Sequence, residues 1–420
     1  MVRVRNVSGY NPVMSIIPRN QYMQQILPYR DQPFIKVITG IRRCGKSAIL
    51  SLLETELRKS GVSDSHIIRI NFENLDYSEI TSAKELDRYV KDRMTDATRY
   101  YVLLDEIQEV AGWEKAVNSL LADGRADIYL TGSNSRLLSS ELATYIAGRY
   151  VEIPVQTLSF SEFLEFAECR TGERPADVHA AFLSYLRMGG FPVIHTAEYT
   201  PESMEKIVYD IYSSAILRDT VQRYNIRNID LLERVVGYVF ENVGNIFSAK
   251  NVADYFKSQH RKVDLNTVYN YLNALESAFI IRRIPRYDLR GREVLATMEK
   301  YYVGDVSLIY ALMGYKDRMI AGILENLVMQ ELSRRGYRVF VGKQDGREVD
   351  FVAERQDERV YVQVCFRMES EETARREFAP LLEIRDHYPK FVVSMDEVWR
   401  ENVDGVRHVP IADFLLMDGW

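Results

Sequence analysis

The stretch that decides the fold runs from Phe34 to Leu50 and reads FIKVITGIRRCGKSAIL. Its first six residues are mostly apolar or β-branched and have the length of a buried strand. The pattern G-x-x-x-x-G-K-S follows, from Gly40 to Ser47, and good helix-forming residues come next. A strand, a glycine-rich turn and a helix in this order predict a loop that binds phosphate groups, the P-loop.

The residue types in this loop suit the phosphates of a nucleotide. Gly40 and Gly45 let the backbone curl so that its N–H groups point inward, and the N-terminus of the following helix adds positive potential. Lys46 is expected to reach the β- and γ-phosphates, and the Ser47 hydroxyl to ligate Mg²⁺. The predicted nucleotide-binding residues are Gly40, Ile41, Arg42, Arg43, Cys44, Gly45, Lys46, Ser47 and Ala48. A chance match to the four fixed positions occurs in roughly one or two of a hundred chains this long, and the flanking strand and helix make it rarer.

Length and composition limit the classes of protein. A chain of 420 residues, 46% hydrophobic and 27% charged, has the composition of a soluble globular protein with roughly two to four domains. The net charge of −6 provides no overall basic field, so any contact with DNA would need a local patch. Cys44, Cys169 and Cys365 are too scattered for a disulfide framework or a zinc site, and they suit a reducing cytoplasm. No stretch approaches the run of about 18 apolar residues that spans a membrane, so we expect a cytoplasmic protein without a membrane contact.

A second motif lies in the stretch RYYVLLDEIQEV, from Arg99 to Val110. Four apolar residues followed by Asp105 and Glu106 form the Walker B pattern, in which a buried strand ends at an acidic pair. Asp105 is expected to hold Mg²⁺ through water, and Glu106 to activate the attacking water as a general base. The alternative is a solvated strand end, but the preceding P-loop at a suitable distance favours the catalytic interpretation.

A third strand ends in polar residues. The stretch from Asp127 to Ser135 reads DIYLTGSNS, a short apolar strand followed by hydroxyl and amide side chains. In a P-loop ATPase this position carries a polar group that senses the γ-phosphate. We predict Asn134 as that sensor, with Ser133 as the alternative.

Four stretches, taken in order, resemble the AAA+-related ATPases found widely in bacteria and archaea. They are GIRRCGKS, YVLLDEIQEV, YLTGSNSRLLSSELATYIAGRY and LSFSEF. The resemblance covers nearly the whole chain and implies binding of ATP and Mg²⁺, ATP hydrolysis and a largely unknown biological role. A Gly-Arg pair recurs after the sensor helix in this family, so Arg149 is a candidate to contact phosphate in its own or a neighbouring subunit, or else an ordinary surface ion pair. Oligomer formation and an unidentified protein partner stay open.

The resemblance and the element pattern together predict four domains and an α/β fold class. Residues 1–157 form the P-loop NTPase core with a parallel sheet, and residues 158–229 form a helical lid. Residues 230–304 form a winged-helix-like middle domain, and residues 305–420 form an α/β domain like a restriction endonuclease. Arg218 and Arg223, in the lid, are further sensor-type candidates, with the solvated face of a helix as the alternative.

The β-hairpin of the predicted winged helix is rich in arginine. Its basic residues are Arg282, Arg283, Arg286, Arg290 and Arg292. Such a cluster can bind DNA phosphates, although a charge run is more often a solvated face. DNA is therefore a candidate partner with a defined location.

The C-terminal domain departs from a working nuclease. Glu325, Asp350 and the tripeptide QVC resemble the PD-(D/E)xK core, in which carboxylates bind Mg²⁺ and a lysine assists the attacking water. Gln363 and Cys365 stand where the acidic residue and the lysine should be. Because a neutral amide and a thiol cannot replace them, we expect a nuclease-like fold without nuclease activity, and Asp350 as a structural hydrogen-bonding residue.

The leading functional interpretation is a Mg²⁺-dependent ATPase in which Lys46, Glu106, Asn134 and Arg149 act on ATP. Turnover would move the winged-helix and C-terminal domains, as in other switches that respond to a phosphate group. The alternative is a nucleotide-dependent binding switch with little turnover, with DNA as one candidate partner. A single P-loop core argues against a helicase.

Overall fold

The computed structural model describes residues 16–135, 146, 148–258, 263–344, 346–397 and 402–420. Within it the chain divides into two compact units. The first comprises Met1–Val37, Lys46–Thr131 and Tyr145–Ile153. The second comprises Ile38–Gly45, Gly132–Thr144 and Pro154–Trp420.

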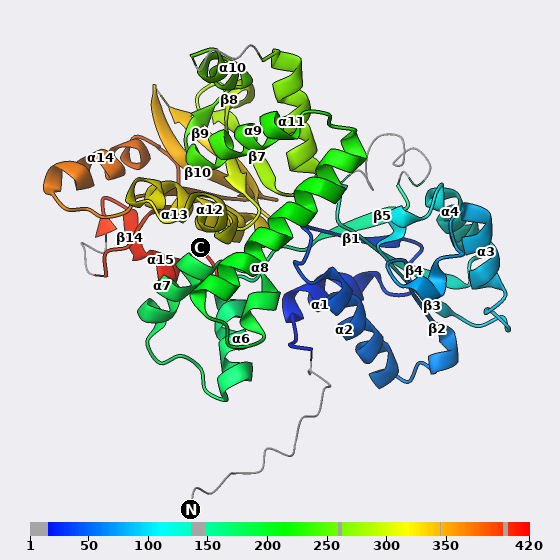
Figure 1. Ribbon diagram of the computed structural model, residues 1–420. Coiled ribbons are helices and arrows are strands. Elements are labelled where there is room, and N and C mark those ends of the chain that lie inside the picture. The colour runs from blue at the N-terminus through cyan, green and yellow to red at the C-terminus, as the bar shows by residue number, and fades with distance from the viewer. Residues whose placement is uncertain (1–15, 136–145, 147, 259–262, 345, 398–401) are drawn as a thin grey trace, which may run out of the picture. The chain divides into compact units, whose positions relative to one another are not determined.

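A five-stranded parallel sheet, with the strand order β2-β3-β4-β1-β5, organises the N-terminal part of the chain (Figure 1). The strands are β1 Ile35–Thr39, β2 Ile67–Asn71, β3 Tyr100–Asp105, β4 Ala126–Gly132 and β5 Tyr150–Pro154. The helices are α1 Asn20–Ile26, α2 Lys46–Lys59, α3 Ala83–Lys91 and α4 Trp113–Asp123. This confirms the predicted α/β fold with a P-loop NTPase sheet.

The order of the strands explains where the helices lie. The chain moves from β1 to β2 in one direction across the sheet and returns through β3 and β4 in the other. Right-handed crossovers therefore place α2 on one face and the α3–α4 pair on the other. Figure 1 shows α3 beside α4 and α2 beside α1. The strands β1, β3 and β4 are fully buried, as their apolar sequences predict.

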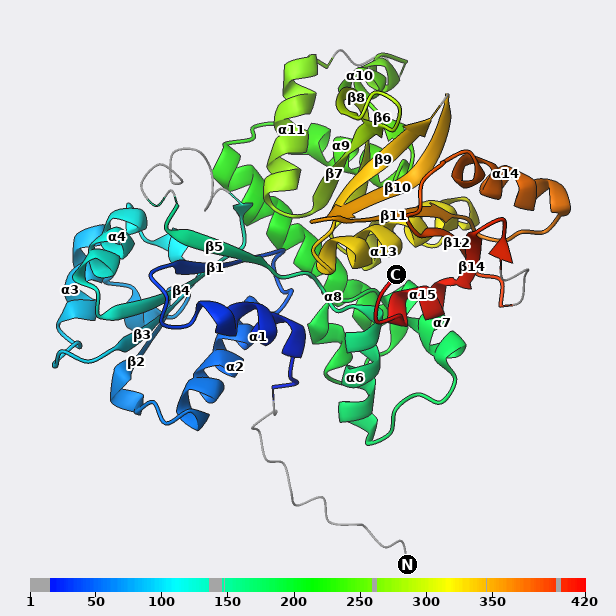
Figure 2. The same cartoon turned by 180° about the vertical axis from the view of Figure 1, so that it is seen from behind.

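The second unit contains a nine-stranded mixed sheet with the order β13-β14-β12-β11-β10-β9-β7-β8-β6 (Figure 2). Its strands are β6 Ile246–Phe247, β7 Ile281–Asp288, β8 Glu293–Val303, β9 Arg338–Gln344, β10 Arg347–Arg355, β11 Glu358–Val364, β12 Lys390–Ser394, β13 Asn402–Val403 and β14 Val406–Pro410. Strand β7 pairs antiparallel with β8 and parallel with β9. The arginine-rich hairpin is thus part of a continuous sheet, and the predicted boundary after residue 304 falls between strands of that same sheet.

The helices of the second unit fall into two groups, before and after the hairpin. Those before the hairpin are α6 Phe160–Thr171, α7 Val178–Met188, α8 Pro201–Ser214, α9 Ile229–Glu241, α10 Ala249–Ser258 and α11 Leu265–Ser277. Those after it are α12 Ser307–Met313, α13 Ile320–Arg334, α14 Glu371–Leu382 and α15 Ile411–Leu416. Helix α14 packs Phe378 and Leu381 against Val352, Tyr361 and Val392 of the sheet. The arrangement of α9, α10 and α11 with the β7–β8 hairpin agrees with the predicted order of elements, while its assignment as a winged helix stays a prediction.

Local sequence signals explain several of these boundaries. Helix α6 begins with a capping box, in which Ser159 Oγ accepts from the Glu162 N–H and the Glu162 carboxylate accepts from the Ser159 N–H. Helix α7 ends at Gly189, whose φ of 72° favours glycine. A Cβ there would lie 2.1 Å from Asp305 Oδ1, so the chain can turn at this point only with glycine.

One segment has a geometry that the sequence did not predict. Helix α8 continues into a π-helical segment, η7 Ala215–Gln222, where the backbone is wound more widely than in an α-helix. Thr220 Oγ1 donates to the carbonyl of Ala215, five residues earlier. The predicted helical lid is therefore helical through α8 and η7, but η7 is a π-helix and not an α-helix.

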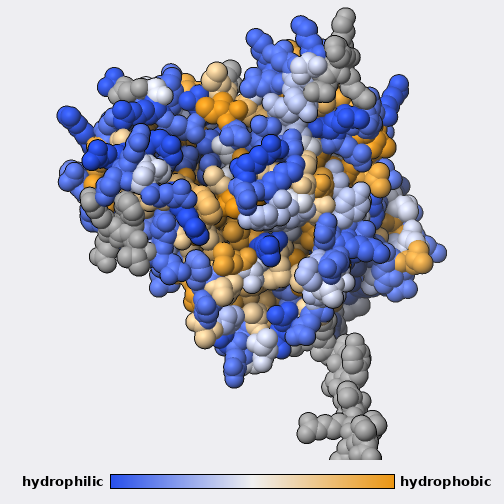
Figure 3. All heavy atoms as spheres, turned by 60° about the vertical axis from the view of Figure 1, so that its left-hand side comes forward, coloured by the Kyte–Doolittle hydropathy of each residue, from blue (hydrophilic) through white to orange (hydrophobic). Residues whose placement is uncertain are grey.

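The surface is mostly hydrophilic on the face shown in Figure 3, where hydrophobic residues form small patches separated by polar ones. Among the residues that the structure describes, no helix combines the length and the apolar character needed to cross a membrane.

Candidate functional site

The phosphate-binding loop has the backbone that its glycines predict. Gly40, Arg43 and Gly45 have φ values of 151°, 66° and 102°, and helix α2 begins immediately afterwards at Lys46. A Cβ on Gly40 would lie 2.1 Å from the Val155 carbonyl oxygen, so only glycine fits there. Three residues with positive φ bend the loop sharply before the helix N-terminus, which is the geometry of an anion-binding loop.

Lys46 and Ser47 are directed at the acidic residues of the second motif. Lys46 is buried, and its Nζ lies 3.7 Å from Glu106 Oε1. The Ser47 side chain lies near the Asp105 carboxylate and acts to lower its pKa. Lys46, Ser47, Asp105 and Glu106 are thus brought together within the first unit, while their roles on ATP and Mg²⁺ stay predictions.

Asp105 offers a free ligand oxygen. Its side chain is fully buried, and Oδ1 accepts a hydrogen bond from Thr131 Oγ1 at 2.5 Å. Its Oδ2 is buried and has no hydrogen-bond partner among the residues that the structure describes. Burial raises the pKa of Asp105, against the hydrogen bond from Thr131 and the nearby Ser47 side chain. A buried carboxylate oxygen without a donor, beside a serine hydroxyl, fits the oxygen ligands that Mg²⁺ prefers.

Glu106 stands in a strained conformation. Its φ of 54° places it in the left-handed region, which is uncommon for a residue with a side chain. Its N–H donates to Thr131 Oγ1 at 2.9 Å, and the Gln108 amide donates to Oε2. Strained backbone of this kind persists where the surroundings hold it, often at functional sites.

Thr131 and Gln108 are functional candidates that the sequence interpretation missed. The Thr131 hydroxyl accepts from the Glu106 N–H and donates to Asp105, so one side chain fixes both acidic residues. The available signal was a threonine at the end of a parallel strand next to the Walker B strand. The glutamine two residues after Glu106 was visible in the motif, but its role depends on the turn that follows the strand.

The predicted sensors, Asn134 and Ser133, form hydrogen bonds with Asp219, which lies far along the chain. Asn134 Nδ2 donates to the Asp219 carbonyl at 3.3 Å, and Ser133 Oγ donates to Asp219 Oδ1 at 3.1 Å. Arg42 Nη1 and Arg223 Nη2 each lie 3.9 Å from the Asp219 carboxylate. The second unit thus brings together Arg42 of the loop, both sensor candidates and Arg223, around an aspartate that the sequence did not single out.

The other predicted arginines lie elsewhere. Arg149 is exposed and donates to Asn118 Oδ1 at 2.6 Å, so its contact with phosphate stays a prediction. Arg218 is exposed on η7. In the hairpin, Arg283 forms ion pairs with Glu276 and Glu299 at 3.6 and 3.5 Å. Acidic neighbours therefore offset part of the positive charge that the hairpin was expected to present.

The residues predicted from the nuclease-like motif form a buried ionic cluster in the second unit. Lys300 Nζ lies 3.0 Å from Glu325, 2.7 Å from Glu348 and 3.3 Å from Asp350. Tyr302 donates to Glu325 at 2.8 Å. Sequence analysis missed Lys300 because it comes from β8, 25 residues before Glu325. No group of three or more His, Cys, Asp or Glu side chains within the described ranges is arranged to hold a metal ion.

Gln363 and Cys365 complete this region. Gln363 accepts from the Asp350 N–H and donates to Glu377, both at 3.2 Å. The Asp350 carboxylate also accepts from the Val364 N–H at 2.8 Å, as expected for a structural hydrogen-bonding residue. Cys365 is buried, and burial raises the pKa of its thiol.

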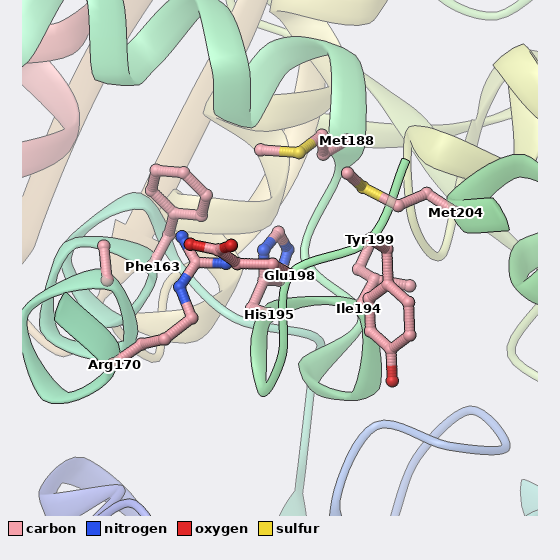
Figure 4. A pocket seen from close by; sticks show the side chains of 9 residues that line it. Phe163, Arg170, Met188, Ile194, His195, Glu198, Tyr199 and Met204 are labelled. Carbon is pink, nitrogen blue, oxygen red and sulfur yellow. The ribbon is translucent and has the colours of Figure 1, made fainter. Parts of the chain in front are cut away.

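A cavity of about 330 Å³ lies in the helical region after the ATPase core. Figure 4 shows its lining, where Glu198 and Arg170 lie among apolar side chains that include Phe163 and Met204. His195 Nε2 donates to the Gly189 carbonyl at 2.8 Å, and burial lowers the pKa of His195 to about 4. The imidazole is therefore neutral at pH 7, and its Nε2 carries the proton that the carbonyl accepts.

Comparisons with known proteins agree with the N-terminal geometry. Residues 32–164 match a family described as an AAA domain, and residues 179–319 match a domain of unknown function, DUF8612. An uncharacterized protein of Haemophilus influenzae is 36% identical over 403 residues, which cover 96% of this chain and 99% of that protein. The uncharacterized protein MJ1544 of Methanocaldococcus jannaschii is 31% identical, over 80% of this chain and 75% of its own length.

Among solved structures, the Walker-type ATPase paby2304 of Pyrococcus abyssi matches with a TM-score of 0.45 and 14% identity. The match covers 73% of this chain and 99% of that one.

Proposed function

This chain belongs to the family of the Haemophilus influenzae and Methanocaldococcus jannaschii proteins and carries an AAA-type P-loop ATPase domain, and from that premise we propose that it is a Mg²⁺-dependent ATPase. The reaction is hydrolysis of ATP by water to ADP and phosphate. The observation that carries the proposal is the group formed by Lys46, Asp105, Glu106 and Thr131.

Each residue of the group has a separate task. Lys46 binds the terminal phosphates, and it gives up its 3.7 Å contact with Glu106 when it does so. Ser47 and Asp105 would hold Mg²⁺, which when bound supplies positive charge to the phosphates. The unsatisfied Asp105 Oδ2 is the feature that supports this assignment.

Glu106 is proposed as the general base. Release from Lys46 leaves a carboxylate that can accept a proton from water, while Gln108 and Thr131 keep its side chain and backbone in place. We further propose that turnover is coupled to movement of the second unit, because the P-loop and β4 each run from one unit into the other.

A nucleotide-dependent binding switch with little turnover is the alternative. It is favoured by one feature, that both oxygens of the Glu106 carboxylate are engaged, one with Lys46 and one with Gln108. A base that stayed in these contacts would not activate water. In either case we propose no nuclease activity, because the Lys300 ammonium lies among the three carboxylates.

Nucleotide binding and turnover by Lys46→Ala test the proposal. Lys59→Ala is the matched control, because Lys59 is exposed at the other end of the same helix. We expect Lys46→Ala to lose ATP binding and turnover and Lys59→Ala to keep both. ATP binding at wild-type affinity by Lys46→Ala would overturn the assignment of the loop.

A further inference from the structure

We propose that Asp219 is a positioning residue of the ATPase site, which holds the sensor Asn134 and the loop residue Arg42 in the orientation that hydrolysis needs. The inference rests on the proposed function and extends it to a residue outside the predicted motifs. Asp219 lies in η7, 85 residues after Asn134.

The first observation is the backbone around Asp219. The π-helical segment buries Asp219 and Thr220, while Leu217 and Arg218 are exposed. Wide turns of this type are rare and are found frequently at functional sites. Here the segment turns Asp219 inward, where its carboxylate accepts from the Ser133 hydroxyl.

The second observation is what Asp219 holds. Its backbone carbonyl accepts from the Asn134 amide, and its carboxylate accepts from the Ser133 hydroxyl. Ser133 and Asn134 are both fully buried, directly after β4. Two consecutive residues of the sensor turn are therefore fixed by one residue, through its main chain and its side chain.

The third observation is the charge around the carboxylate. Arg42 and Arg223 approach it from two segments, each at 3.9 Å, and Asp219 is only 2% exposed. A buried carboxylate needs such partners, and in turn it fixes where they point.

These contacts predict a defect in the chemical step. Asp219 is not one of the residues proposed to bind the phosphates or Mg²⁺, so its loss should leave most of the nucleotide affinity intact. Loss of the carboxylate charge releases Arg42 and weakens the hold on the turn that carries Ser133 and Asn134. Misorientation of these groups by a fraction of an ångström should lower kcat, since positioning errors of about 1 Å cost about a hundredfold.

The test is the ATP hydrolysis of the full chain carrying Asp219→Asn, which keeps the side-chain volume and removes the charge. We expect kcat to fall by roughly tenfold to a hundredfold, with KM and the affinity for ATP changed less than about threefold. Asp210→Asn is the matched control, because Asp210 is exposed on the preceding helix α8. That control should behave as wild type.

A double-mutant cycle separates positioning from a structural role. Ser133→Ala removes the hydroxyl that donates to Asp219, and Asp219→Leu removes the acceptor at similar volume, so the effect of Ser133→Ala on kcat should nearly vanish in the Asp219→Leu background. Additive effects, wild-type kcat in Asp219→Asn, or a lower melting temperature with unchanged kcat would each overturn the inference. Loss of ATP binding together with kcat would also overturn it, in favour of a binding role.

The proposed ATPase function and the role of Asp219 can be overturned separately. If wild type shows no turnover, the proposed function fails and the inference falls with it. If wild type hydrolyses ATP, Glu106→Gln does not, and Asp219→Asn equals wild type, only the inference is overturned.

Discussion

Carboxylates lie beside strands in the interior at two places in the molecule. The two places differ in the groups that contact the carboxylate oxygens. In the first unit, Asp105 keeps one oxygen without a hydrogen-bond donor among the described residues. In the second unit, Glu325, Glu348 and Asp350 surround the Lys300 ammonium. An unsatisfied oxygen is a place for an external cation, whereas an internal ammonium already supplies the positive charge. An acidic motif therefore predicts a metal site only where one of its carboxylates, here Asp105 and not Glu106, keeps an oxygen without a partner among the described residues.

The largest effect is expected from Lys300→Met. This change leaves three carboxylates in a buried cluster without their ammonium, so we expect the free energy of unfolding to fall by about 3–5 kcal/mol. Urea unfolding of the full chain measures it, with the exposed Lys59→Met as control. Millimolar Mg²⁺ should restore part of the stability in Lys300→Met only. Wild-type stability in that variant would contradict the role given to Lys300.

The pH dependence of stability extends the comparison to His195, a buried side chain that donates a hydrogen bond to one carbonyl. Its pKa in the folded state is about 4, below the usual value of about 6.5. As the pH falls from 6.5 to 4, His195 takes up a proton in the unfolded chain but not in the folded chain, so the free energy of unfolding falls. The contribution is about 3 kcal/mol between pH 6.5 and pH 4. His195→Gln should lack this part of the slope, and an unchanged slope in chemical unfolding would exclude His195 as its source.

Asp105→Asn should separate activity from stability. Loss of the carboxylate should lower kcat roughly a hundredfold, about 2.7 kcal/mol in the activation free energy. Stability should not fall, because burial raises the pKa of Asp105 and the charged form is therefore costly in the folded state. Steady-state kinetics and urea unfolding of the same preparation give both numbers. A large loss of stability would mean that Asp105 is a structural residue like Asp350.

The smallest effect is expected from Thr131→Val, which keeps the shape and removes the hydroxyl. Both the Asp105 oxygen and the Glu106 N–H then lose their partner, so kcat should fall by about tenfold. Thr131→Ser keeps the hydroxyl and should restore most of the rate. Equal activity of the valine and serine variants would show that the hydroxyl does not position the acidic pair.

Sequence reasoning found the residues that depend on local structure. The strand, loop and helix around Lys46 are consecutive in the chain, and so is the acidic pair at the end of β3. The cap of α6 needs only Ser159 and Glu162, three residues apart. The confirmed P-loop fold follows from such short-range signals.

The residues it missed depend on contacts between distant segments. Thr131 reaches Asp105 from a neighbouring strand, and Asp219 reaches Asn134 from a helix 85 residues later. Lys300 enters the carboxylate cluster from β8, because β7 pairs with β9 and makes the hairpin part of the C-terminal sheet. A single sequence does not show which distant strands and helices come into contact. The π-helical winding of η7 likewise follows from packing rather than from helix propensity.

The most direct test of the account is ATP turnover by Glu106→Gln, measured with and without DNA and together with ATP affinity. Glu109→Gln is the control, because Glu109 is an exposed carboxylate three residues further along. The account predicts that Glu106→Gln binds ATP as wild type does and loses turnover by about a hundredfold or more, while Glu109→Gln keeps both. Turnover at the wild-type rate in Glu106→Gln, or tight ATP binding by wild type without any turnover, would contradict it.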